Sequence, residues 1–132
     1  MLEVDKDHFI THNGVTFAGN HIILDIWNAK YLNDREFIEN TLIDAIEQAG
    51  ATLLHIHLHT FTEGGGISGV AVLAESHISV HTWPEKSFAA FDIFMCGVAD
   101  PEKAVDAIKK AFKPERVIVG GMKRGVMSGS VV

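Results

Sequence analysis

The sequence predicts one domain over residues 1–132, an α/β (α+β) two-layer sandwich with a mainly antiparallel sheet and two helices packed on one face. Segments of strand character follow one another through short turns, and only two segments have helical periodicity. Short connections favour antiparallel pairing, and two helices are enough to cover one face of the sheet. With 132 residues and 47% hydrophobic content, the chain can bury a core of its own.

The first half of the chain predicts a strand, a helix and a second strand. Residues 21–28 are apolar and β-branched, which is typical of a strand. Asn33 is expected to begin the helix, because Glu36 three residues later would complete a capping box, and Gly50 is expected to end it. Residues 52–61 alternate as a strand does. One face of this predicted strand carries Leu54, Ile56 and Leu58, and the other carries His55, His57 and His59.

The second half predicts four more strands and a helix, after a flexible turn over residues 63–66. Strands are expected over residues 69–74, 77–83, 88–96 and 116–119. Asp100 and Pro101 predict the second helix as its N-cap and first helical residue. Its inner face is expected to carry Val105, Ile108 and Phe112. The segment from Met122 to Val132 has no clear period. The uncovered sheet face would suit a partner copy, so a homo-oligomer is expected.

Composition excludes several classes of function. The net charge of −6 argues against nucleic-acid binding, which needs clustered basic residues. The single cysteine, Cys96, excludes an internal disulfide and fits a reducing compartment. The first residues lack the basic start and apolar run of a signal peptide, and no apolar run approaches the roughly 20 residues that span a bilayer. We therefore expect a soluble cytoplasmic protein without nucleic-acid or membrane partners.

Groups suited to nucleophilic and acid–base chemistry gather in the middle of the chain. Ser76 follows Glu75 at a break between two predicted strands, and His77 comes next. His81 lies further along the same strand, and a base near a candidate nucleophile favours a functional role. Each residue also has an ordinary interpretation: Ser76 as a turn residue, Cys96 as a buried core thiol and Glu85 as a solvated carboxylate.

The histidines of residues 52–61 offer a different class of function. Residues two apart on a strand share a face, so His55, His57 and His59 could present imidazoles to a zinc ion. No acidic or cysteine ligand lies at a diagnostic spacing, and a short histidine tract is only a compositional hint. The expectation is therefore that the protein has no metal site, with a histidine-tract metal-binding domain as an alternative.

Three short segments stand out in the order Glu75-Ser76-His77, His81-Thr82-Trp83-Pro84-Glu85 and Cys96-Gly97. On these segments the chain resembles the prokaryotic S-adenosylmethionine decarboxylase proenzymes, which are pyruvoyl-dependent, and the resemblance extends roughly from His21 to Arg124. It implies self-cleavage between Glu75 and Ser76 into residues 1–75 (β chain) and 76–132 (α chain). Ser76 would become a covalent pyruvoyl cofactor that binds the substrate amine as a Schiff base. The product would supply aminopropyl groups for spermidine synthesis, and the cleaved protomers would form a homodimer.

The same resemblance implies a role for each matching residue. His81 would be the proton acceptor in processing, and Ser68 would assist it. Cys96 would be the proton donor in catalysis. Glu85 would hold the ribose hydroxyls, Phe61 would stack on the adenine, and Ile78 would be a further substrate contact.

Three alternatives remain open at this point. A related pyruvoyl enzyme could decarboxylate arginine or ornithine with the same machinery. In a different class, the chain could be an uncleaved non-enzymatic partner subunit, or the histidine-tract metal-binding domain described above.

Overall fold

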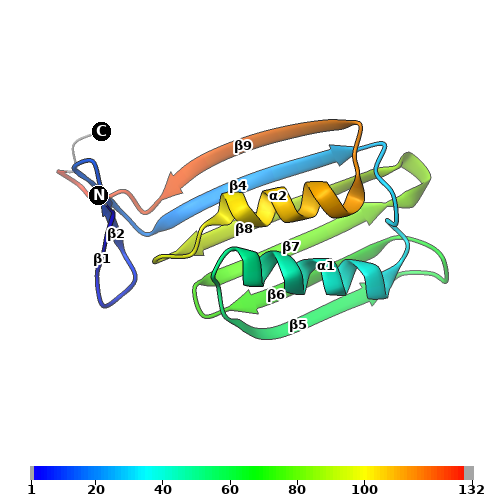
Figure 1. Ribbon diagram of the computed structural model, residues 1–132, viewed down its shortest axis with the longest axis horizontal. Helices are drawn as coiled ribbons and strands as arrows, with labels where there is room; N and C mark the ends of the chain where they lie inside the picture. Colours follow the sequence, from blue (N-terminus) through cyan, green and yellow to red (C-terminus); the bar gives the residue numbers. More distant parts are fainter. Residues whose placement is uncertain (1, 130–132) are drawn as a thin grey trace.

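The computed structural model describes residues 2–129 and confirms the predicted fold class: a six-stranded antiparallel sheet carries two helices on one face (Figure 1). The helices are α1 (Arg35–Gln48) and α2 (Pro101–Phe112), and a short 3-10 helix, η1 (Pro84–Lys86), joins two strands. The strands in spatial order are β5 (Leu53–Thr60), β6 (Ile67–Leu73), β7 (Ser76–Trp83), β8 (Phe88–Cys96), β4 (Gly19–Trp27) and β9 (Arg116–Arg124).

A second, smaller sheet at the N-terminus has no counterpart in the predicted elements. It consists of β1 (Leu2–Val4), β2 (Ile10–His12) and β3 (Val15–Phe17), and it lies at one end of the large sheet (Figure 1). Strands of three residues are too short to show alternation in a sequence. The sheet has a small core of its own, made by Ile10, Val15 and Phe17. We call residues 2–17 the N-terminal sheet.

The first helix begins one residue later than the sequence predicts. Its N-cap is Asp34, whose Oδ1 accepts the backbone N–H of Phe37 at 3.0 Å, so the capping box predicted from Asn33 and Glu36 is wrong. Both residue types cap helices, and the sequence cannot separate two adjacent candidates. The second helix begins as predicted, with Asp100 as N-cap and Pro101 as its first residue.

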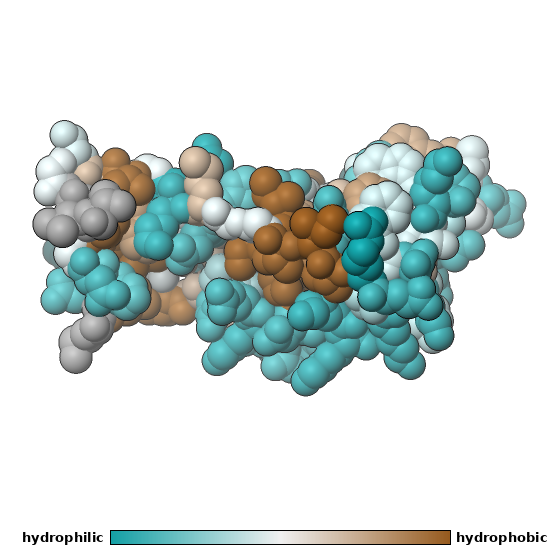
Figure 2. Space-filling model, turned by 90° about the horizontal axis from the view of Figure 1, so that it is seen from above, coloured by the Kyte–Doolittle hydropathy of each residue, from teal (hydrophilic) through white to brown (hydrophobic). Residues whose placement is uncertain are grey.

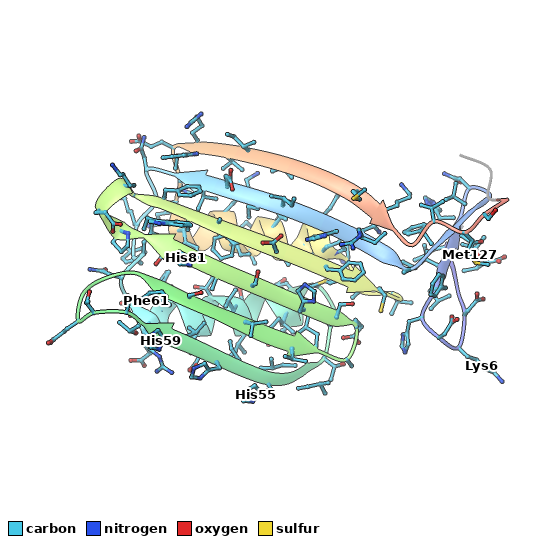
Figure 3. All side chains as sticks on the ribbon, turned by 180° about the vertical axis from the view of Figure 1, so that it is seen from behind. Lys6, His55, His59, Phe61, His81 and Met127 are labelled. Carbon is cyan, nitrogen blue, oxygen red and sulfur yellow. The ribbon has the colours of Figure 1, made fainter. Side chains whose placement is uncertain are left out.

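The two faces of the large sheet differ in their surroundings. One face packs against the helices, where the predicted inner residues of α2, Val105, Ile108 and Phe112, are buried with Phe91 and Ile93 of β8. No element of residues 2–129 packs across the other face, which we call the open face (Figure 3). His55, His57 and His59 lie on the open face as predicted, because they pair in register with alternate residues of β6. The fold thus leaves a broad sheet surface without cover.

Two strand details differ from the sequence prediction. Leu54 is 63% exposed instead of facing the helices, because the pairing of β5 with β6 shifts register between Leu53 and His55. The last strand continues past Val119 to Arg124, since β4 pairs with it along its whole length. β9 forms an edge of the sheet, and Figure 2 looks onto that edge, where hydrophobic side chains gather at its middle. Ile118 and Val119 are among the exposed apolar residues there.

Neither α1 nor α2, the α-helices within residues 2–129, has the length and apolar character needed to cross a membrane.

Candidate active site

The hairpin between β6 and β7 carries the predicted cleavage position. Leu73 pairs with Ser76, so Ala74 and Glu75 form its two-residue turn. The carboxylate of Glu75 accepts the backbone N–H of Thr52 at 2.8 Å and its hydroxyl at 3.4 Å. The carbonyl of Thr52 in turn accepts the N–H of Ala74 at 3.0 Å. The Glu75 side chain therefore ties this turn to the start of β5.

The backbone carbonyl of Glu75 is held by two donors from the same residue. Cys96 donates its backbone N–H to the Glu75 oxygen at 2.9 Å, and its Sγ–H to the same oxygen at 2.8 Å. The register of β7 with β8 pairs Ser76 with Met95, which brings the next residue, Cys96, opposite the turn. Two hydrogen bonds to one carbonyl oxygen draw electron density from its carbon and stabilise negative charge on the oxygen. This carbonyl is therefore prepared for attack by a nucleophile.

Ser76, the next residue, has a strained backbone. Its φ is 149°, in a region that is populated mainly by glycine and costs other residues about 1–3 kcal/mol. Its Oγ lies 4.0 Å from Cys96 Sγ. The structure thus brings Glu75, Ser76 and Cys96 together at the end of β7. Strain at Ser76 raises the energy of the intact chain, which favours a rearrangement that relieves it.

A second group of predicted site residues lies at the other end of β7. Ser68 of β6 pairs in register with His81 of β7, so the two side chains are neighbours on the open face. The His81 ring lies 4.1 Å from the ring of Trp83 and 5.7 Å from that of Phe61 (centroid to centroid). Figure 3 shows Phe61, His59 and His81 close together on this face. Glu85 follows in η1 with its carboxylate exposed.

The structure does not bring His81 to Ser76 within one chain. The two residues are five positions apart in β7, and at about 3.3 Å per residue their Cα atoms are separated by roughly 16 Å. A hydrogen bond or proton transfer between them needs a heavy-atom distance of about 3 Å. Because a strand is fully extended, closeness in sequence does not become closeness in space. A single chain therefore holds two separate half-sites, Glu75–Ser76–Cys96 and Ser68–His81–Phe61.

Ile78 has a different environment from the other predicted substrate contacts. Its side chain is fully buried in the core beneath the helices, as the alternation of β7 requires. A ligand on the open face could meet only its backbone.

The open face also carries a polar cluster that was not predicted from the sequence. The Asp92 carboxylate lies 3.1 Å from His21 Nε2 and accepts a hydrogen bond from Ser79 Oγ at 3.4 Å. Arg124 Nη1 lies 3.2 Å from His21 Nδ1, so that Nδ1 can accept while Nε2 donates. The available signal was an aspartate at an alternating position in the otherwise apolar strand 88–96.

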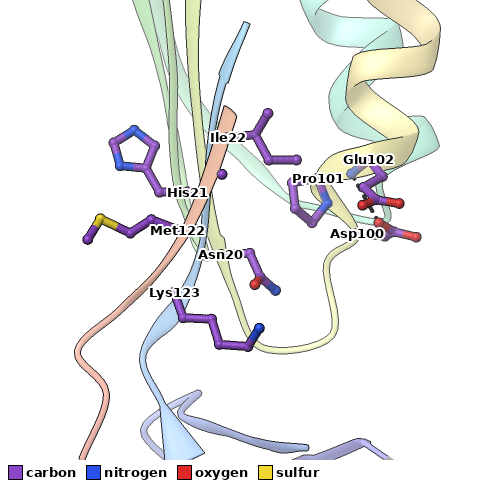
Figure 4. Close-up of a pocket in the computed structure, with 9 residues that line it drawn as sticks. Asn20, His21, Ile22, Asp100, Pro101, Glu102, Met122 and Lys123 are labelled. Carbon is purple, nitrogen blue, oxygen red and sulfur yellow. Dashed lines mark hydrogen bonds between the residues drawn. The ribbon is translucent and has the colours of Figure 1, made fainter. Parts of the chain in front are cut away.

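No metal centre forms within residues 2–129, where no group of three or more His, Cys, Asp or Glu side chains is placed to hold an ion. His55, His57 and His59 share a face without converging on a common point with another ligand. One cavity of about 340 Å³ lies between the start of α2 and strands β4 and β9. Figure 4 shows Pro101 and Ile22 on its side of the strands, with His21 and Met122 pointing to the opposite side. None of the residues in the two half-sites lines it.

Fold and geometry together define a two-layer α+β protein that holds a doubly hydrogen-bonded peptide carbonyl next to a serine with a strained backbone. The sequence model of one family, S-adenosylmethionine decarboxylase, matches residues 20–125, most of the chain. The chain belongs to the S-adenosylmethionine decarboxylase family.

Individual relatives agree with this assignment. A protein of Methanococcus maripaludis strain C5, named S-adenosylmethionine decarboxylase proenzyme, is 46% identical over 112 residues, which span 83% of this chain and 91% of the relative. A protein of the same name from Thermomicrobium roseum is 36% identical over 110 residues, 83% of this chain and 95% of the relative. The crystal structure of the adenosylmethionine decarboxylase from Aquifex aeolicus superposes with a TM-score of 0.78 at 32% identity, covering 88% of this chain and 98% of that one.

Proposed function

We propose that this protein is made as a proenzyme, cuts itself between Glu75 and Ser76, and then decarboxylates S-adenosylmethionine. The observation that carries the proposal is the Glu75 carbonyl, which accepts two hydrogen bonds from Cys96 immediately before the strained Ser76. Family membership and the proenzyme names of the relatives support the same reaction. The product would be the aminopropyl donor for spermidine synthesis, made in the cytoplasm.

Self-cleavage would begin with an acyl shift. Ser76 Oγ attacks the Glu75 carbonyl carbon, the peptide C–N bond breaks, and the amide nitrogen takes up the hydroxyl proton. The result is an ester between Glu75 and the Ser76 side chain. Negative charge develops on the Glu75 oxygen during this step, where the N–H and S–H of Cys96 stabilise it. Relief of strain at Ser76 offsets part of the cost of replacing an amide with an ester.

Cleavage would follow by elimination. A base removes the Ser76 α-proton, a Cα=Cβ double bond forms, and the bond between Ser76 Cβ and the ester oxygen breaks, which leaves Glu75 as a carboxylate at the end of residues 1–75. Water then releases ammonia from the new N-terminus of residues 76–132 and leaves a pyruvoyl group there. We assign His81 as the base and Ser68 as the hydroxyl that assists it, since the two are neighbours on β6 and β7.

The residues around Ser76 fit a pyruvoyl group at this position. When formed, a pyruvoyl group supplies an electron sink for decarboxylation. It would lie within reach of the Cys96 thiol, since Cys96 Sγ is 4.0 Å from Ser76 Oγ in the intact chain. Cys96 is then positioned to return a proton to the substrate carbon after carbon dioxide leaves.

The separation of the two half-sites leads us to propose a homodimer with composite active sites. A two-fold axis between two facing sheets, crossing β7 at right angles near Ile78 and Ser79, would set Ser76 of one copy opposite His81 of the other. The two positions are equally far from that point along β7. Face-to-face sheets pack about 10 Å apart, which side chains from both copies can bridge. Each dimer would then contain two complete sites.

The character of the open face supports this assembly. It carries large apolar side chains that are substantially exposed in one chain: Ile23, Val70, Val72, Ile118 and Met122. Exposed apolar surface on this scale is typical of interfaces between copies. The Asp92, His21 and Ser79 cluster would lie near the proposed axis, where its hydrogen bonds satisfy polar groups that the second sheet would bury.

Substitution of Cys96 separates its two proposed roles. Cys96→Ala is expected to slow self-cleavage by about tenfold, since the backbone N–H still donates to Glu75. The decarboxylation rate of the cleaved protein should fall by about 10²- to 10³-fold because the proton donor is lost. Cys96→Ser keeps a donor to the Glu75 oxygen and should restore cleavage without restoring turnover. Fragment formation on denaturing gels and single-turnover assays measure the two rates. Equal turnover in all three proteins would assign Cys96 to packing alone.

The substrate is tested by carbon dioxide release from carboxyl-labelled S-adenosylmethionine, arginine and ornithine. We expect release from S-adenosylmethionine only. Glu85→Gln should raise the KM for it by about 10- to 100-fold, since a carboxylate bond to a hydroxyl contributes roughly 1.5–3 kcal/mol. Glu63→Gln, in the same chain but outside the half-sites, is the matched control. Release confined to arginine or ornithine would favour the related amino-acid decarboxylase and leave the self-cleavage proposal standing.

A further inference from the structure

We infer that the N-terminal sheet positions Cys96 for self-cleavage, through a backbone contact from His8. The inference rests on the proposed function. The N-terminal sheet lies outside residues 20–125, the range that the family model matches. It is nevertheless fixed to the end of the large sheet at which Glu75, Ser76 and Cys96 meet (Figure 1).

The loop between β1 and β2 has a defined shape before it meets the large sheet. Its ends are joined by the N–H of Asp5, which donates to the Phe9 carbonyl at 2.8 Å, and the N–H of His8 donates to the Asp5 carbonyl at 2.9 Å. The Asp7 carboxylate accepts the N–H of Phe9 at 3.1 Å. His8 has a φ of 69°, which turns its carbonyl out of the loop. The loop therefore presents this carbonyl as a fixed acceptor.

The His8 carbonyl accepts a hydrogen bond from Gly97, the residue after Cys96. The N–H of Gly97 donates to the His8 carbonyl at 3.0 Å. Gly97 has a φ of 66°, which favours glycine, and a Cβ at this position would lie 3.0 Å from Nδ1 of the His8 imidazole, so a side chain here would crowd His8. The turn that ends β8 is thus held from one side by Glu75, through Cys96, and from the other side by His8.

A second set of contacts keeps the N-terminal sheet in place. The N–H of Ala18 donates to the Arg124 carbonyl, and the N–H of Met127 donates to the Thr16 carbonyl, both at 2.8 Å. The ammonium group of Lys123 lies 5.4 Å from the centre of the Phe17 ring. The end of β9 and the residues after it therefore hold β3 and Ala18 in place, while the β1–β2 loop contacts Gly97. Figure 3 shows Lys6 of this loop and Met127 at the same end of the molecule, away from His81 and Phe61.

The consequence concerns the rate of the acyl shift. The two donors of Cys96 stabilise charge on the Glu75 oxygen only while they keep their direction, and that direction depends on the turn through Gly97. His8 acts through Gly97, whose N–H its carbonyl accepts, so it is a positioning residue. Loss of its contact should slow the first chemical step and leave the elimination by His81 unaffected.

The test compares two substitutions of His8 in the full chain. Proline cannot adopt a φ of 69° and lacks the N–H given to Asp5, so His8→Pro displaces the carbonyl. Glycine accepts that φ readily, so His8→Gly is the conservative variant that keeps the backbone contact. Cleavage of freshly synthesised chain is followed on denaturing gels with and without hydroxylamine, which cuts an accumulated ester, and thermal unfolding is recorded for each protein.

We expect His8→Pro to slow cleavage about three- to tenfold, the range that corresponds to one lost hydrogen bond. No ester should accumulate, and His8→Gly should restore the rate to within about twofold of wild type. If His8→Pro fails to fold, Gly97→Ala tests the same contact, because its Cβ meets His8 and its φ becomes strained. Unchanged rates in His8→Pro and Gly97→Ala, or ester accumulation in either, would overturn the inference. A wild-type chain that never cleaves would instead refute the proposed function.

Discussion

Ser76→Ala is expected to yield an intact chain of 132 residues with no detectable decarboxylase activity. Without the hydroxyl, nothing attacks the Glu75 carbonyl, however strongly Cys96 polarises it, and no pyruvoyl group can form. No other group can replace the nucleophile of a self-processing site. The rate of cleavage and the decarboxylase activity should therefore each fall by more than about 10³-fold. The fold should persist, because Ser76 contributes little to the core and alanine removes only one hydroxyl.

The matched control for this substitution is Ser79→Ala. Ser79 lies on the same strand, donates only a long bond to Asp92, and stands outside both half-sites. Gel electrophoresis under denaturing conditions and the carbon dioxide assay compare the two variants. Cleavage in Ser76→Ala would place the scissile bond elsewhere in the chain. Loss of cleavage in both would point to a general defect of the sheet or of the proposed dimer interface, near which Ser79 lies.

Co-expression of Ser76→Ala and His81→Ala chains is expected to restore cleavage that neither variant performs alone. In a mixed dimer, Ser76 of the His81→Ala chain would meet His81 of the Ser76→Ala chain, so one of its two sites is complete. Only the His81→Ala chain can then be cut, which differently sized tags on the two chains would reveal on a gel. At equal expression and random pairing, about half of all His81→Ala chains enter mixed dimers, so cleavage should rise from background to roughly half of the His81→Ala chains.

A site contained within one chain makes the opposite prediction for this pair. Both variants would stay intact in every combination, because each chain would lack one of the groups it needs. The control is co-expression of Ser76→Ala with a chain that carries both Ser76→Ala and His81→Ala, where no combination contains Ser76. Cleavage in that control would exclude Ser76 as the nucleophile.

Most of the large sheet and both helices could be predicted from local pattern. Alternation marked β7 and β8, and the Asp100–Pro101 pair marked the start of α2, because these signals arise from backbone geometry and capping within a few residues. The register shift that exposes Leu54, and the continuation of β9 to Arg124, depend on pairing with a neighbouring strand that is distant in sequence. The strands of the N-terminal sheet are too short for alternation to appear.

The chemistry of the site could be predicted only in part. Residue types and spacing pointed to Ser76 and His81, and the family resemblance added Cys96. The structure adds the two hydrogen bonds that join Cys96 to the Glu75 carbonyl. The sequence could not give the distance between Ser76 and His81, because that follows from their being in one extended strand. This distance, more than the residue types, leads to the proposal of a composite site.

The most direct test of self-cleavage is the mass of the purified wild-type protein under denaturing conditions. We predict two chains, residues 1–75 and residues 76–132, with the second lighter by one ammonia than a chain that begins with serine, and closed to Edman degradation because a pyruvoyl end has no amine. An intact chain without activity would favour the uncleaved partner subunit. An intact chain that releases carbon dioxide from S-adenosylmethionine would contradict the proposed mechanism.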